Sequence, residues 1–240
     1  MLIQACVNGV RDVTEHHRLS ADEHVVATEA ARAVAVGAGA IHVHAKDAEG
    51  RDSLDGVDVA RWLTAVRSAC PGIPIGVTTG AWAAPDLEER LAAIAAWTEL
   101  PDFASVNWHE DGADDVAALL LSRGVDVEAG LWDAEGAEAW SRSPVRGECQ
   151  RVMVELPDIP VAMVRSEAQD LAARVRRVEQ AVPILLHGED LSTWAAFDLA
   201  VEHGWDTRIG LEDCLTLPDG RHASGNAALV RAAVERIPVR

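Results

Sequence analysis

Short apolar runs rich in Val, Ile and Leu alternate with amphipathic segments along the whole chain. A short apolar run bounded by Gly, Pro or Asp is typical of a buried strand, and apolar residues spaced three and four apart are typical of a helix. The apolar runs predict eight strands, at residues 2–8, 40–45, 75–79, 103–107, 125–131, 151–156, 183–187 and 207–211.

A helix-like pattern follows each predicted strand. Ser20, with Glu23 three residues later, is a capping-box signature, in which a hydroxyl and a carboxylate close the first turn of a helix. Pro85 and Asp86 mark the start of another helix. The predicted helices cover residues 20–36, 57–69, 86–97, 113–123, 133–140, 166–181, 192–203 and 226–237.

Strands that alternate with helices predict a parallel α/β sheet. Eight such units in 240 residues match a (β/α)8 TIM barrel near the lower end of its usual size, as one domain over residues 1–240. An open, doubly wound sheet would show the same alternation. Because no G-x-G-x-x-G follows the first strand and no linker divides the chain, we favour the closed barrel.

Composition narrows the range of partners. Apolar residues make up 49% and charged residues 25%, which is typical of a globular protein. The formal charge of −18 repels phosphate backbones and anionic lipid, so we expect neither a nucleic-acid nor a membrane partner. The four cysteines form no C-x-x-C pair, and the chain shows no signal sequence and no apolar stretch of membrane length. We therefore expect a cytoplasmic protein.

Two predicted strand ends carry residues that could bind a metal. His42 and His44 are two apart, so both imidazoles can point into the mouth of a barrel. By the same alternation along the last strand, one face carries Arg208, Gly210 and Glu212. The last strand lies near the second strand once the barrel closes. Two imidazoles and one carboxylate with an open position form a catalytic zinc arrangement. Alternatively the histidines are packing residues and Glu212 belongs to a solvated turn.

Four segments carry a family resemblance: residues 41–50 (IHVHAKDAEG), 77–80 (VTTG), 104–107 (ASVN) and 208–226 (RIGLEDCLTLPDGRHASGN). In this order and spacing they resemble the β-keto acid cleavage enzymes. The resemblance runs from residue 2 to about residue 234 and is strongest in the first and last thirds. The H-x-H and G-L-E-D motifs are its specific part.

The resemblance implies a zinc-dependent (β/α)8 barrel that forms a homo-oligomer, a dimer or a tetramer. One zinc per chain would be held by His42, His44 and Glu212, and Asp213 with Arg208 would activate a small keto acid substrate. The acyl part of that keto acid would be exchanged with acetyl-CoA, the possible co-substrate, to give acetoacetate and a new CoA thioester. Residues expected to bind the substrate are Thr78, Ser105, Arg11 and Glu128.

The chain departs from the family pattern at several positions. Arg11 replaces a glutamate that binds the ammonium group of the substrate in the family. Arg11 therefore either binds a substrate with an anionic or strongly polar tail or points to the surface. Gly130 replaces an acidic residue, and the loops at residues 108–111 and 156–160 differ on the coenzyme side. These departures keep two alternatives open: a zinc-dependent lyase or hydrolase without CoA, and a non-catalytic ligand-binding barrel.

Further polar residues lie at the predicted active face. Lys46 replaces the arginine usual in the family; it either binds a substrate carboxylate or acts as a base, or simply pairs with Asp47, Asp52 or Glu212, and we prefer the pairing. His187 ends the seventh predicted strand and Glu189 follows it; we expect both to be ordinary loop polarity, although loops at this face are where function concentrates.

Overall fold

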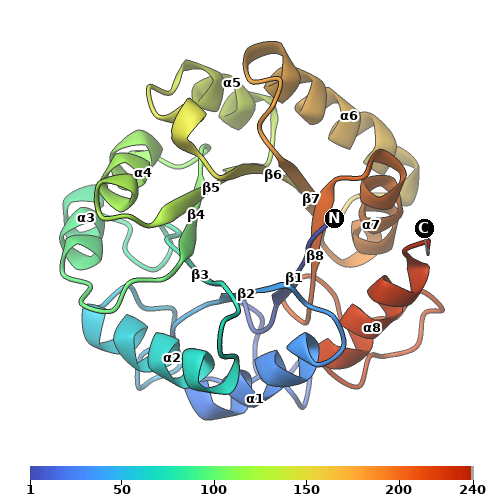
Figure 1. The fold of residues 1–240 in the computed structure, drawn as a ribbon, viewed down its shortest axis with the longest axis horizontal. Helices are drawn as coiled ribbons and strands as arrows, with labels where there is room; N and C mark the ends of the chain where they lie inside the picture. Colours follow the sequence, from blue (N-terminus) through green and yellow to red (C-terminus); the bar gives the residue numbers. More distant parts are fainter. Residues whose placement is uncertain (239–240) are drawn as a thin grey trace.

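The computed structural model of the chain describes residues 1–238. Its strands close into one ring in sequence order, with β8 pairing back to β1, and every neighbouring pair is parallel. Figure 1 looks into this ring and shows the helices arranged around its outside. The predicted (β/α)8 barrel is therefore confirmed, and the open doubly wound sheet is excluded.

The strands are short and almost wholly buried, as expected of a parallel sheet covered on its outer face by helices. Two of them, β4 and β6, have the predicted bounds. The strands are β1 (Ile3–Cys6), β2 (Ala40–Val43), β3 (Ile75–Thr78), β4 (Phe103–Asn107), β5 (Asp126–Leu131), β6 (Arg151–Leu156), β7 (Ile184–Gly188) and β8 (Asp206–Ile209).

Aspartate side chains cap several of the helices by accepting hydrogen bonds from backbone N–H groups of the first turn, as at Asp55 and Asp133. The helices are α1 (Glu23–Val34), α2 (Gly56–Ala69), α3 (Leu87–Ala95), α4 (Ala113–Ser122), α5 (Ala134–Arg142), α6 (Val161–Val178), α7 (Thr193–His203) and α8 (Asn226–Arg236). Two short 3-10 helices, η1 (Arg146–Glu148) and η2 (Asp190–Ser192), lie in connecting segments.

Most other predicted boundaries were wrong by one or more residues, and three of these differences have a clear physical cause. Helix α1 begins after Asp22, whose carboxylate caps it, and Glu23 pairs with Arg61 instead of closing a capping box with Ser20. Helix α6 begins at Val161, directly after Pro160, so it starts five residues before the predicted residue 166. Strand β8 ends at Ile209, and the residues that follow form a turn.

The strands separate an apolar outer layer from a polar interior. Ile41 and Val43 join the hydrophobic layer between strands and helices, so His42, which lies between them, faces the inside of the ring. Other inward residues such as Gln4 and Arg208 are also buried and polar. The closed barrel thus gathers polar side chains from strands that are distant in sequence.

Among residues 1–238 no helix combines the length and the hydrophobicity that a membrane crossing requires.

Candidate metal and catalytic site

The three predicted metal ligands meet at the carboxyl ends of β2 and β8. Strand β1 lies between these two strands, with Cys6 in register with His42 and Gln4 in register with Arg208. One ligand atom from each of His42, His44 and Glu212 lies within 4.8 Å of the others. The predicted convergence of these residues, which are separated by about 170 positions in the chain, is therefore confirmed, although Glu212 lies in the turn after β8 and not on the strand.

Two glycines let the turn after β8 approach β1. A Cβ atom on Gly210 would lie 1.9 Å from the carbonyl oxygen of Cys6, and one on Gly9 would lie 2.2 Å from Cγ of Glu212. The backbone N–H of Glu212 donates to the same Cys6 carbonyl at 3.3 Å. Any side chain at residue 9 or 210 would displace the carboxylate of Glu212 from the histidines.

Asp52 fixes the orientation of His44. His44 Nδ1 lies 3.0 Å from Asp52 Oδ2, which leaves Nε2 facing Glu212 Oε1 at 3.5 Å. Trp82 Nε1 donates to Asp52 Oδ2 at 2.6 Å, and its ring stacks on His44 with the centroids 6.0 Å apart. A carboxylate on the far nitrogen of an imidazole is the usual second partner of a metal-binding histidine.

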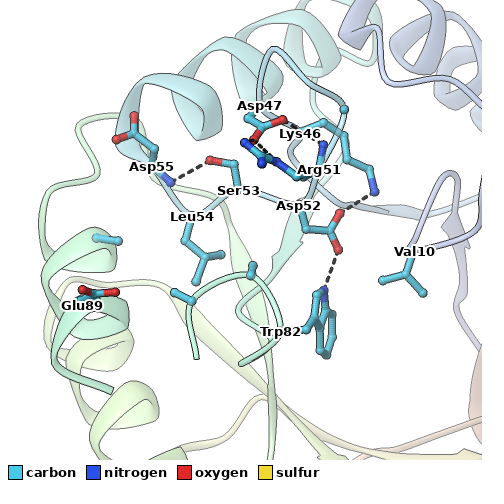
Figure 2. A pocket seen from close by; sticks show the side chains of 14 residues that line it. Val10, Lys46, Asp47, Arg51, Asp52, Ser53, Leu54, Asp55, Trp82 and Glu89 are labelled. Carbon is cyan, nitrogen blue, oxygen red and sulfur yellow. Dashed lines mark hydrogen bonds and ion pairs between the residues drawn. The ribbon is translucent and has the colours of Figure 1, made fainter. Parts of the chain in front are cut away.

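A cavity of about 710 Å³ opens beside Asp52, between the loops that follow β2 and β3. Figure 2 shows the Asp52 carboxylate between the ammonium group of Lys46 and the indole of Trp82. Charged side chains dominate the wall on the side of the β2 loop, including Asp47 and Arg51. The cavity therefore borders the candidate metal site at Asp52, while His42, His44 and Glu212 do not line it.

The electrostatics of the three ligands fit a divalent cation. Burial lowers the pKa of His42 to about 3, so its imidazole is neutral and able to coordinate. Burial also disfavours a charged His44, but the carboxylates of Glu212 and Asp52 outweigh it and raise its pKa to about 9, so His44 would have to release a proton to coordinate a cation. His42 Nδ1 and Glu212 Oε2 are buried without a hydrogen-bond partner within residues 1–238. Two nitrogens and a carboxylate with unpaired atoms are a donor set suited to zinc.

Asp213 and Arg208 lie next to the three candidate ligands. Arg208 Nη2 donates to Glu212 Oε1 at 2.9 Å and to Asp213 Oδ1 at 3.2 Å. The thiol of Cys6 donates to Asp213 Oδ2 at 2.7 Å. Burial raises the pKa of Asp213, but Arg208 and His187 outweigh it and hold this pKa below its ordinary value. Asp213 is thus an ionised carboxylate with a fixed orientation.

The three predicted substrate contacts on β3, β4 and β5 form one row. Thr78 pairs in register with Ser105, and Ser105 with Glu128. Glu128 is fully buried; it accepts a hydrogen bond from Gln4 Nε2 at 2.9 Å and pairs with Arg151 Nε at 3.2 Å. Burial raises the pKa of Glu128 to about 7. Contact of these three residues with a substrate stays a prediction. The carboxylate of Glu128 is already bound to Gln4 and Arg151.

Arg11 does not point to the surface, and its contact with a substrate tail stays a prediction. Its guanidinium donates to the backbone carbonyls of Glu212 at 2.9 Å and Asp213 at 3.0 Å, and to Asp190 Oδ1 at 2.6 Å. Arg11 therefore ties the loop after β1 to the loops after β7 and β8 instead of pointing outward. Lys46 pairs with Asp52, one of the partners expected for it, and also donates to the carbonyl of Gly9 at 2.6 Å.

Sequence reasoning missed four residues of the site. Cys6 carries no local pattern, since its partner Asp213 is reached only through the closed barrel. Asp52 was expected only as a possible partner of Lys46, and the path of the loop after β2 also brings it to His44. Glu155 and His187 lie near the carboxyl ends of β6 and β7, so the parity rule applied to His42 would have found them. Glu155 Oε2 lies 2.9 Å from His187 Nε2, and His187 is 1% exposed, which corrects its assignment as ordinary loop polarity.

The fold and the site define a class: a (β/α)8 barrel enzyme with its polar side chains gathered at the carboxyl ends of the strands, where such barrels carry their active sites. The chain matches the family model of the beta-keto acid cleavage enzymes over residues 1–238 and belongs to that family.

Two relatives are named 3-keto-5-aminohexanoate cleavage enzyme. The protein from Fusobacterium nucleatum is 24% identical and that from Acetoanaerobium sticklandii is 23% identical, each over 98% of this chain and 90% of the relative. Their agreement with the family match extends the resemblance through the middle third of the chain.

Solved structures share the fold at lower identity. ObcA in a binary complex with oxaloacetate superposes with a TM-score of 0.72 at 15% identity, over 91% of this chain and 63% of ObcA. The chain thus spans less than two thirds of that protein. The 3-dehydroquinate dehydratase from Aquifex aeolicus VF5 superposes with a TM-score of 0.60 at 13% identity, over 98% of this chain and 96% of that chain.

Proposed function

We propose that this enzyme exchanges the acyl group of a β-keto acid with acetyl-CoA in a zinc-dependent, retro-Claisen reaction. The observation that carries the proposal is the convergence of His42, His44 and Glu212 next to the Arg208–Asp213 pair. The names of the two relatives support the reaction class. Structures of ObcA with oxaloacetate, and with a C4-CoA adduct and oxalate, support a keto acid and a CoA compound as reactants on this fold.

His42, His44 and Glu212 would hold the zinc ion. Zinc bound there supplies Lewis-acid polarisation of the substrate ketone, which stabilises negative charge that develops on its oxygen. Asp52 keeps His44 in the orientation that directs Nε2 to the ion. Glycine at residues 9 and 210 leaves the space that Glu212 requires.

The remaining chemistry falls to Asp213 and Arg208. Asp213 removes a proton from the carbon between the ketone and the carboxylate of the keto acid, and Arg208 keeps Asp213 ionised and oriented. The resulting carbanion forms a bond to the acetyl carbonyl carbon of acetyl-CoA and displaces the coenzyme thiolate. The thiolate then attacks the original acyl carbon, and the old carbon–carbon bond breaks. Asp213 returns its proton to that carbon, so acetoacetate and the new thioester form without net gain of atoms.

The substrate pocket would be completed by the hydroxyls of Thr78 and Ser105 on the adjacent strands β3 and β4. We also propose a homo-oligomer, a dimer or a tetramer, in the cytoplasm. Four buried thiols support a reducing compartment.

The first test measures zinc in the purified protein, prepared without chelators, and thermal stability with and without acetyl-CoA. About one zinc per chain and a higher melting temperature with acetyl-CoA are expected, because a ligand that binds only the folded state stabilises it. His42→Ala should lose the zinc, while His24→Ala, an exposed histidine on α1, should retain it. A His42→Ala protein with full zinc content would overturn the metal assignment.

The second test avoids the unknown tail of the keto acid. Acetoacetate is itself a β-keto acid, so the proposed reaction should carry the label of ¹³C-acetyl-CoA into acetoacetate with no other substrate present. Label exchange by the wild type and its loss in Asp213→Asn support the acyl exchange. No exchange, combined with cleavage of β-keto acids in the absence of acetyl-CoA, would establish a lyase or hydrolase instead. Absence of turnover with any acceptor would establish a binding barrel.

A further inference from the structure

Glu155 and His187 form an ion pair inside the mouth of the barrel that no step above uses. Glu155 is on β6 and His187 on β7, and the two residues are in register. Their side chains are 3% and 1% exposed, with Glu155 Oε2 at 2.9 Å from His187 Nε2. A buried charged pair is costly to maintain, so its position beside the reacting groups calls for an explanation.

His187 connects Glu155 to Asp213. Its second ring nitrogen, Nδ1, is buried without a hydrogen-bond partner among the described residues, and lies at ion-pair distance, 3.5 Å, from Asp213 Oδ1, the oxygen that accepts a hydrogen bond from Arg208. Charges close to His187 come from Glu155 on β6, Arg208 on β8, and Asp213 and Glu189 in the loops. Burial and Arg208 lower the pKa of His187, but the carboxylates outweigh them and raise it to about 9. His187 is thus an imidazolium held between two carboxylates.

Gly130 makes this arrangement possible. A Cβ atom on Gly130 would lie 2.4 Å from Glu155 Oε1 and 2.5 Å from Asn107 Oδ1. The glycine on β5 therefore leaves the space that the carboxylate of its neighbour on β6 occupies. Glu155 Oε1 is buried and has no hydrogen-bond partner among the described residues, so packing alone does not account for the carboxylate.

We propose that Glu155 and His187 are positioning residues for Asp213: Glu155 orients the imidazole, and His187 together with Arg208 fixes the oxygen Oδ1 of Asp213 toward the substrate. Gly130, which favoured a non-catalytic barrel in the sequence, becomes part of the catalytic support. This inference rests on the proposed catalytic role of Asp213.

The kinetic test uses the exchange of ¹³C-acetyl-CoA into acetoacetate. Glu155→Gln and His187→Gln should each lower kcat about 10- to 100-fold with KM changed less than about threefold, because orientation of a general base acts on the chemical step. Gly130→Ala should lower kcat similarly, although it leaves every reacting group in place. Changing Glu155 and His187 to Gln in one protein should cost no more activity than either single change, since residues that act as one unit are not additive.

Matched controls separate positioning from loss of folding. Glu29→Gln changes a buried glutamate on α1 that pairs with Arg32, and Gly136→Ala adds a methyl group to a buried glycine on α5 with 3.4 Å of clearance. Both controls should retain wild-type kcat. Glu155→Gln and His187→Gln proteins with wild-type kcat, or additive losses in the double variant, would overturn the proposal while leaving the acyl exchange intact.

A spectroscopic test shows whether His187 holds Asp213 even if the protein has no measurable turnover. In ¹⁵N-histidine-labelled protein at pH 7, His187 should carry protons on both ring nitrogens. Glu155→Gln should perturb the Nε2 proton and Asp213→Asn the Nδ1 proton. A neutral imidazole, or an Nδ1 signal unchanged in Asp213→Asn, would show that His187 does not hold Asp213. Failure of the acyl exchange would appear separately, as absence of label transfer by the wild type.

Discussion

At the scale of single residues, Asp52 is the side chain on which the candidate metal site depends most. Its carboxylate forms hydrogen bonds with His44, Trp82 and Lys46 at the same time. Burial would raise the pKa of Asp52, but His44 and Lys46 outweigh it and lower this pKa to about 2. The carboxylate is therefore charged over the whole physiological range and holds the imidazole in one orientation.

Replacement of Asp52 should weaken metal binding without removing a ligand. Asp52→Asn is expected to lower zinc affinity about 10- to 100-fold, as is usual for the second partner of a ligating histidine. Competition with a chromogenic chelator would measure this affinity. Asp58→Asn, which alters a partly buried ion pair with Arg61 on α2, is the control and should bind zinc like the wild type. Equal affinities in both variants would exclude the role given to Asp52.

At the scale of elements, Arg11 holds three loops in one arrangement. It binds the backbone carbonyls of Glu212 and Asp213 and the carboxylate of Asp190. Asp190 donates its own N–H to the Asp213 carbonyl at 2.8 Å and has φ of +43°, in the left-handed region that a non-glycine residue enters only under constraint. The loops after β1, β7 and β8 thus support each other and carry both Glu212 and Asp213.

Arg11→Lys separates this role from recognition of a substrate tail. A lysine ammonium cannot reproduce the several directed bonds of the guanidinium, so kcat should fall about 10-fold and unfolding free energy by about 1–2 kcal/mol. KM should change little. Steady-state kinetics and urea unfolding measure these quantities, with Arg165→Lys at an exposed site on α6 as control. A selective rise in KM for keto acids with anionic tails would instead establish Arg11 as a substrate contact.

At the scale of the whole molecule, the charged groups buried inside the closed barrel lower its free energy of unfolding. Glu128 illustrates this cost, because its pKa is raised from 4.5 to about 7 on folding. The folded state therefore binds more protons than the unfolded state between these values, and stability falls as the pH rises through this window.

Glu128→Gln should remove this part of the pH dependence. Between pH 5 and pH 8 the wild type should lose on the order of 2–3 kcal/mol of unfolding free energy through Glu128. The variant should lose correspondingly less, whereas Glu138→Gln, at an exposed site on α5, should follow the wild type. Denaturant unfolding at the two pH values measures the difference. Identical losses in wild type and Glu128→Gln would show that Glu128 titrates normally.

The sequence by itself determined the barrel, the order and approximate position of its elements, and the pairing of His42 and His44 with Glu212. Hydrophobic periodicity is local, and strand parity carries over to any closed parallel barrel, so both are legible along the chain. The sequence did not predict the turn that ends β8 at Ile209. Glu212 still reaches the histidines, because Gly9 and Gly210 leave room for this turn beside β1.

Only the tertiary structure decided how the site is supported. Asp52 behind His44, Arg11 across three loops, and Glu155 with His187 beside Asp213 are contacts whose partners are set by loop paths and by closure of the ring. Such contacts join groups between 8 and 202 positions apart and leave no periodic trace in the chain. Local propensity acts over a few residues, whereas these contacts depend on how all eight strands are arranged.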